Sequence, residues 1–102
     1  MDLKPGSRWR SAVCDAEVVV VRSPAASVTF RIGGIGALPA ETGRPDGVEP
    51  HVALAGGTLL GKRYADEVSG LEVLCTKAGT GTITVDGRRA TVMTPRQLPA
   101  SD

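Results

Sequence analysis

Short β-branched runs separated by glycine and proline constrain this chain more than any other feature. Thirteen Gly and seven Pro are spread over 102 residues. No stretch of about 11 residues repeats its apolar positions with the period of a helix. Runs rich in Val and Thr suit extended strands instead. The sequence therefore predicts an all-β protein, either a small antiparallel sandwich or an open barrel.

Four runs carry the strand signals. Residues 13–22 contain four consecutive valines, which suits a strand covered on both faces or one that twists between two sheets. Residues 28–32 alternate apolar and polar side chains, and we expect them to form a hairpin with the first run. Residues 51–55 predict a short strand. Residues 71–75 predict a firmer one, because every second side chain is apolar.

The clearest local signal is the Asp86-Gly87 pair between two β-rich runs, residues 81–85 and 88–93. Asp-Gly favours the two-residue type I′ turn, which needs positive φ at both positions. The register imposed by this turn pairs Val85 with Arg88, Ile83 with Ala90 and Gly81 with Val92. We therefore expect a C-terminal hairpin with its apolar side chains on one face.

The length of the chain and the positions of its Gly and Pro residues predict the domain organisation. A chain of 102 residues and 10.5 kDa suits one domain. We place this β domain at residues 1–95, with a Gly/Pro-rich loop at 33–50 that is too long for a simple connector. Residues 96–102 are expected to be a C-terminal tail.

Composition excludes several classes of partner. Twelve Lys and Arg against eleven Asp and Glu give a net charge of +1. With this charge balance we expect no basic surface patch for nucleic acid and no electrostatic attraction to an anionic membrane. No apolar run approaches the roughly 20 residues that cross a bilayer. These features predict a cytoplasmic protein whose two cysteines stay reduced.

In the N-terminal third, Trp9 precedes Ser11-Ala-Val-Cys14, and Phe30-Arg31-Ile32-Gly33-Gly34 follows the valines. Over about residues 8–38 this order resembles the desulforedoxin family of rubredoxin-type β-ribbons. In that family an aromatic residue precedes a Cys-x-x-Cys turn, a Val-rich strand follows, and a Cys-Cys-Gly segment comes next. The resemblance implies a strand-knuckle-strand shape and dimerisation through strand edges. Residues 57–64 and 71–77 resemble small bacterial proteins, a likeness that implies no activity.

The positions of the family's metal ligands have changed in this chain. Only Cys14 keeps a ligand identity; Ser11 stands at the first cysteine, and Arg31 and Ile32 stand at the cysteine pair. A tetrahedral iron or zinc site needs four such ligands, and Ile32 has no donor atom. The sequence therefore predicts a degenerate metal site, with no metal and no cofactor.

Two alternatives for these residues stay open. Cys14, Cys75 and His51 are the candidate ligands for a residual iron or zinc site, or two Cys14 and two Cys75 would share one across a dimer. Cys14 is also a candidate redox thiol or nucleophile, although no base is positioned beside it by any local pattern. Against both stands the simpler interpretation of Cys75 as a buried apolar side chain and His51 as a loop residue.

The segment Gly56-Gly-Thr-Leu-Leu-Gly61-Lys62 matches most of a phosphate-binding P-loop. Arg63 follows where the loop needs a Ser or Thr hydroxyl for Mg²⁺. Because this hydroxyl is absent, the segment is predicted to be a glycine-rich turn and not the phosphate-binding loop of a nucleotide-hydrolysing enzyme. Lys62 and Arg63 remain candidates for binding a small anionic ligand.

The sparse chemistry favours a non-enzymatic role, and no catalytic residue is predicted. We expect an accessory or interaction module that binds a partner protein, itself, or both, through strand edges and the loop at 33–50. The alternatives are a residual metal or redox protein using Cys14 with Cys75, and an anion binder at Lys62 and Arg63.

Overall fold

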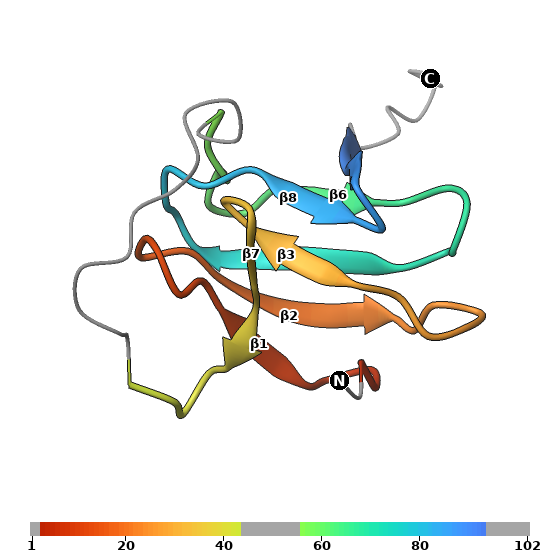
Figure 1. Ribbon diagram of the computed structural model, residues 1–102, viewed down its shortest axis with the longest axis horizontal. Helices are drawn as coiled ribbons and strands as arrows, with labels where there is room; N and C mark the ends of the chain where they lie inside the picture. Colours follow the sequence, from red (N-terminus) through yellow and green to blue (C-terminus); the bar gives the residue numbers. More distant parts are fainter. Residues whose placement is uncertain (1–2, 44–55, 94–102) are drawn as a thin grey trace, which may run out of the picture.

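The fold is built entirely from antiparallel strands and turns (Figure 1). It is seen in a computed structural model, which describes residues 3–43 and 56–93. The strands are β1 (Arg8–Arg10), β2 (Glu17–Arg22), β3 (Phe30–Ile32), β4 (Ile35–Gly36), β5 (Leu38–Pro39), β6 (Arg63–Ala65), β7 (Glu72–Lys77), β8 (Ile83–Val85), β9 (Arg88–Arg89) and β10 (Thr91–Met93). These described residues include no helix that could cross a membrane.

Two sheets form the molecule. The larger has six strands in the order β10-β6-β7-β2-β1-β5, and the smaller has four in the order β4-β3-β8-β9. Figure 1 shows β3 and β8 of the smaller sheet in front of β7 and β6 of the larger one. The all-β antiparallel class predicted from the sequence is confirmed.

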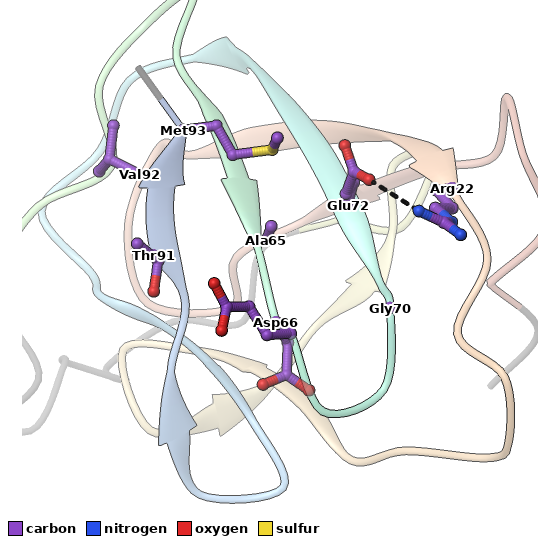
Figure 2. A pocket seen from close by; sticks show the side chains of 9 residues that line it. Arg22, Ala65, Asp66, Gly70, Glu72, Thr91, Val92 and Met93 are labelled. Carbon is purple, nitrogen blue, oxygen red and sulfur yellow. Dashed lines mark ion pairs between the residues drawn. The ribbon is translucent and has the colours of Figure 1, made fainter.

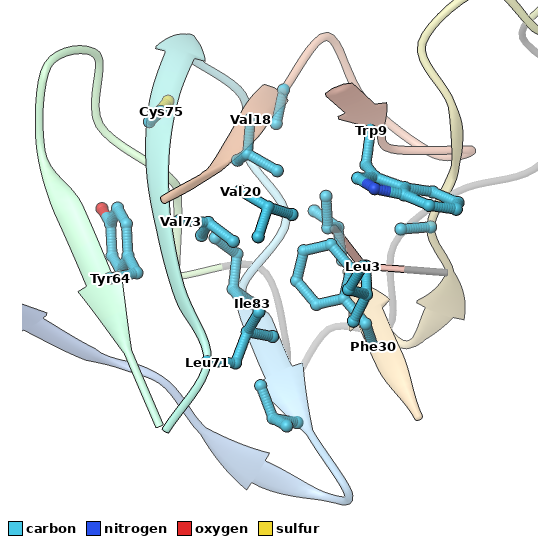
Figure 3. Close-up of a cluster of buried hydrophobic side chains, with 14 of the residues drawn as sticks. Leu3, Trp9, Val18, Val20, Phe30, Tyr64, Leu71, Val73, Cys75 and Ile83 are labelled. Atoms are coloured by element: carbon cyan, nitrogen blue, oxygen red, sulfur yellow. The ribbon is translucent and has the colours of Figure 1, made fainter. Parts of the chain in front are cut away.

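One core, mainly aliphatic but with all three aromatic residues of the chain, lies between the two sheets. Along β2, Val18 and Val20 are buried while Val19 between them is only half-buried, because successive side chains of a strand point to opposite faces. From the smaller sheet, Phe30 and Ile32 join the same cluster (Figure 3). The expectation that the valine run is covered on both faces is therefore wrong, since its outer face is open.

An internal duplication organises both sheets. β1 pairs with β2 in the same register as β6 with β7: Arg8 lies opposite Val19, and Arg63, 55 residues later, lies opposite Leu74. β3, β4 and β5 correspond to β8, β9 and β10 at a separation of 53 residues. If each strand is replaced by its counterpart from the other half, both sheets keep the same strand order, read from the opposite edge. Residues 3–39 and 58–93 are hereafter the N-terminal and C-terminal halves.

The two halves meet along a pseudo-twofold axis. In the larger sheet the equivalent residues Val19 and Leu74 lie directly opposite one another across β2 and β7. In the smaller sheet, Arg31 lies opposite its equivalent, Thr84. Backbone hydrogen bonds follow the same symmetry, since the N–H of Gly33 donates to Thr82 as that of Asp86 donates to Thr29. Each half therefore completes the core of the other.

Two expectations about the N-terminal half are wrong. Residues 13–22 and 28–32 do not form a hairpin, because β2 lies in the larger sheet and β3 in the smaller one. The segment at 33–50 is not one long loop either. Its first part contains a Gly33-Gly34 turn, β4 and β5. The strand expected at residues 51–55, the rest of the loop and the tail at 96–102 lie outside the described residues.

The C-terminal hairpin is confirmed in part. Asp86 and Gly87 have φ values of 51° and 82°, as a type I′ turn requires, and Val85 pairs with Arg88. The expected pairing of Gly81 with Val92 is wrong. Beyond residue 90 the chain leaves the smaller sheet, and β10 pairs with β6 in the larger one.

Candidate functional site

The larger sheet has two edge strands that are equivalent by the pseudo-symmetry but differ in chemistry. Pro39 in β5 lies opposite Trp9, as Val92 in β10 lies opposite Tyr64. Proline has no N–H, so β5 cannot donate a hydrogen bond from that position to a further strand. β10 has no proline, and all three of its residues are exposed. Of the two edges, β10 is therefore the one open to strand addition.

The register of β10 shows which of its backbone groups are free. The N–H of Cys75 donates to the carbonyl oxygen of Lys62, and the N–H of Asp66 donates to that of Leu71. Along β6, the backbone groups of even-numbered residues therefore point toward β7. Because backbone groups alternate in direction along an antiparallel strand, residues 63 and 65 bond instead to β10, through Thr91 and Met93. The N–H and C=O of Val92 therefore point outward to solvent.

A pocket of about 430 Å³ opens beside this edge (Figure 2). Its lining consists of the three residues of β10, the end of β6, the turn at residues 66–70, and Glu72 with Arg22. Val92 and Met93 are 43% and 39% exposed, which is high for large apolar side chains. The open edge and the pocket thus form one continuous surface.

An ion pair between a buried carboxylate and an exposed guanidinium lies beside the pocket. Arg88 donates from Nε to Asp66 Oδ1 at 3.0 Å and from a terminal nitrogen to Oδ2 at 2.8 Å. Ser69 donates to the same carboxylate from both its hydroxyl and its N–H. The Arg88 hydrogen bonds hold the pKa of Asp66 well below its usual range, although burial opposes them. Asp66 is therefore ionised, and the turn at 66–70 is held in place.

The remaining charges of the pocket are mostly acidic. Glu72 pairs with Arg22 at 3.6 Å across the sheet (Figure 2). Glu67 is exposed on the turn. Since Arg88 and Arg22 offset Asp66 and Glu72, Glu67 leaves the pocket with a net negative charge. This lining favours an apolar side chain that ends in a basic or polar group.

The sulfur of Cys14 lies in a buried nest of backbone amides. The side chain is 5% exposed, and the N–H of Gly81 donates to Sγ at 3.4 Å. Burial alone raises the pKa of the Cys14 thiol. The hydrogen bonds from Ser11 and from the backbone outweigh it, so the pKa lies below the ordinary value. A lowered pKa favours the thiolate form of Cys14, but burial keeps reagents away from the sulfur.

The other predicted metal ligands do not gather around Cys14. Cys75 is buried in the core, where burial raises its pKa, and both cysteines are free. Within residues 3–43 and 56–93, no group of three His, Cys, Asp or Glu side chains is placed to hold a metal. His51 lies outside the described residues. Both cysteines are buried, so a site shared across a dimer would need them to become accessible, and it stays a prediction.

Lys62 and Arg63 are both exposed at the start of β6. The N–H groups of Thr58, Gly61 and Lys62 are already bonded to backbone carbonyls, and that of Leu59 is bonded to the Tyr64 hydroxyl. Four amides of the glycine-rich turn are thus already bonded and cannot cradle phosphate as the amides of a P-loop do. Anion binding here would depend on the two side chains alone and stays a prediction.

Comparison with known protein families, curated proteins and solved structures finds no match to this chain. The resemblance to the desulforedoxin family therefore stays a prediction. Sequence reasoning missed the β10 edge and its pocket. The available signal was the repeat itself, in which Arg8-Trp9 and Glu17-Val18 recur 55 residues later as Arg-Tyr and Glu-Val.

Proposed function

We propose that this protein is a non-enzymatic interaction module that binds an extended segment of a partner protein along β10. The observation that carries the proposal is the outward-facing N–H and C=O of Val92 on an exposed edge strand without proline. An added strand gains backbone hydrogen bonds from such an edge. The equivalent edge, β5, is blocked by Pro39, so each molecule would bind one segment.

The pocket supplies side-chain selectivity to the same surface. In strand addition, backbone bonds provide affinity while pockets beside the edge read alternate side chains of the added strand. Here the Met93 side chain offers apolar contact on the pocket's face of the sheet, and Glu67 is the lining carboxylate that no arginine offsets. We therefore expect the bound segment to carry an apolar residue and a Lys or Arg in alternation.

The test uses peptides selected from a random library on the immobilised protein. Val92→Pro removes the outward N–H without removing a bond to β6, and it copies the residue that β5 carries at the same position. Val92→Thr is the matched control, because it keeps the N–H and the β-branched shape. We expect selected peptides to bind wild type and Val92→Thr but not Val92→Pro, and to protect the Val92 amide from hydrogen exchange.

Equal binding of the peptides to Val92→Pro would contradict the proposal, provided that circular dichroism shows the variant to be folded. Light scattering tests a second copy of the chain as the occupant. A dimer that Val92→Pro converts to a monomer would show that β10 pairs with itself. Pro39→Val should create a second binding edge and raise the stoichiometry from one peptide to two.

A further inference from the structure

The outer face of the larger sheet carries a second surface, which adjoins the β10 edge because Arg63 lies opposite Met93. Trp9, Val18 and Val73 turn inward to the core, so the alternate residues of β1, β2, β6 and β7 face outward. Register places four of these in one row across the sheet, in the order Arg63, Leu74, Val19 and Arg8. The pseudo-twofold axis passes through the middle of this row.

Most charges on the outer face are already paired. Arg22 lies 3.6 Å from Glu72, and its symmetry equivalent Lys77 lies 3.9 Å from Glu17. Arg10 is close to the carbonyl oxygens of Ser11 and Thr42. Excess positive charge therefore remains at the ends of the central row.

Arg8 and Arg63 are those ends. Both are exposed, and neither side chain has a hydrogen bond or ion pair within the described part of the chain. Neighbouring strands lie about 4.8 Å apart, so three strand spacings put the two Cα atoms about 14 Å apart. Between them, Val19 and Leu74 form a half-buried aliphatic strip. The row is thus cationic at both ends and apolar in the centre.

We infer that this outer face binds an acidic segment of a partner protein, with one carboxylate on Arg8, one on Arg63 and an aliphatic side chain over Val19 and Leu74. Charge complementarity selects an anionic occupant, since the unpaired charges of the row are both guanidinium groups. The aliphatic centre selects a peptide over a nucleic acid. Trp9 and Tyr64 are buried, so the row offers no aromatic side chain for base stacking.

Strand geometry defines the probe. An extended chain rises about 3.3 Å per residue, so glutamates four residues apart lie about 13 Å apart on one face, with the residue midway between them on that face too. The probe peptide is Ser-Thr-Glu-Thr-Val-Thr-Glu-Thr-Ser. Its control has the same composition and charge but adjacent glutamates, Ser-Thr-Thr-Glu-Glu-Thr-Val-Thr-Ser.

The readout is an NMR titration of the full chain with each peptide at low salt. We expect the probe to shift the methyl signals of Val19 and Leu74 and to bind more tightly than the control. Arg8→Gln and Arg63→Gln should each weaken binding roughly two- to fivefold, as expected for exposed ion pairs. Arg31→Gln is the matched control, because Arg31 is an exposed cation on the other sheet. It should leave binding unchanged.

Several results overturn the inference. They are equal binding of probe and control, no methyl shifts at millimolar peptide, and losses with Arg31→Gln that equal those with Arg8→Gln. Tighter binding of a single-stranded oligonucleotide of equal charge would reassign the face to nucleic acid. Val92→Pro should not alter probe binding, so failure here is distinguishable from failure of the β10 proposal.

Discussion

The two halves of this chain share a backbone but differ in which surfaces they leave open. In the N-terminal half, the turn after β1 is sealed, with Ser11 and Val13 buried. In the C-terminal half, Val68, the equivalent of Val13, is 74% exposed against 2% for Val13. The N-terminal half buries its turn and carries Pro39 on its edge strand, whereas the C-terminal half leaves its turn and its edge strand exposed. The two halves therefore expose different surfaces although they share a backbone.

The turns themselves use different chemistry for the same purpose. Ser11 Oγ accepts the N–H groups of Val13 and Cys14 at 3.0 and 3.2 Å. At the equivalent position Asp66 accepts the N–H of Ser69 and adds an ion pair to Arg88. A neutral oxygen suffices inside the core, whereas the turn beside the pocket is held by a charged pair. Four predictions probe this comparison.

The largest effect is expected from separating the halves. Residues 1–43 and 56–102, made as two chains, should each be unfolded, because each alone exposes its central strands and half of the core. An equimolar mixture should regain the β-sheet circular dichroism spectrum. A half that folds without the other would contradict the shared core.

Truncation of the core at symmetry-related positions comes next. Phe30 and Ile83 are equivalent and both buried. Phe30→Ala should cost about 3–5 kcal/mol of unfolding free energy, and Ile83→Val only about 1 kcal/mol, since the cost follows the volume removed. Urea denaturation measures both. A cost below about 1 kcal/mol for Phe30→Ala would show that residue 30 is not packed in the shared core.

Gly79 provides a sharper test of how the halves meet. A Cβ at this position would lie 2.5 Å from the backbone nitrogen of Ala16 and 2.6 Å from Cys14 Sγ. We expect Gly79→Ala to cost about 1–3 kcal/mol by overpacking. Gly36→Ala is the matched control, because a Cβ there meets nothing within 4 Å. Equal stabilities in urea would show that residue 79 does not closely approach the N-terminal half.

The smallest effect concerns pH and distinguishes the two turns. Because the folded-state pKa of Asp66 is depressed, its contribution is complete above the unfolded pKa of about 4 and is lost as the pH falls toward the folded value. In Asp66→Asn, the unfolding free energy should depend less steeply on pH below pH 4. The slope should fall by an amount that corresponds to the uptake of at most about one proton on unfolding. Ser11→Ala should leave that slope unchanged. Urea titrations between pH 2 and 6 measure both slopes.

Local elements were predictable where the signal is local. The Asp86-Gly87 turn and the buried face of residues 71–75 follow from turn chemistry and period-two alternation, and the structure has both. The pairing of 13–22 with 28–32 failed, because periodicity says that a run is extended but not which sheet it joins. The β10 edge escaped prediction for the same reason: its sequence reads as the second arm of a hairpin.

The all-β class and the Asp86-Gly87 turn can be predicted from the sequence alone, since they depend on backbone preference and alternation along a few residues. Long-range packing sets the pairing of β2 with β7 and not with β3, the pseudo-twofold relation of the two halves, and the exposure of Val92 where Pro39 blocks its counterpart. Such pairings join residues some 55 positions apart. Their free energy comes from surfaces that exist only after both halves have folded together.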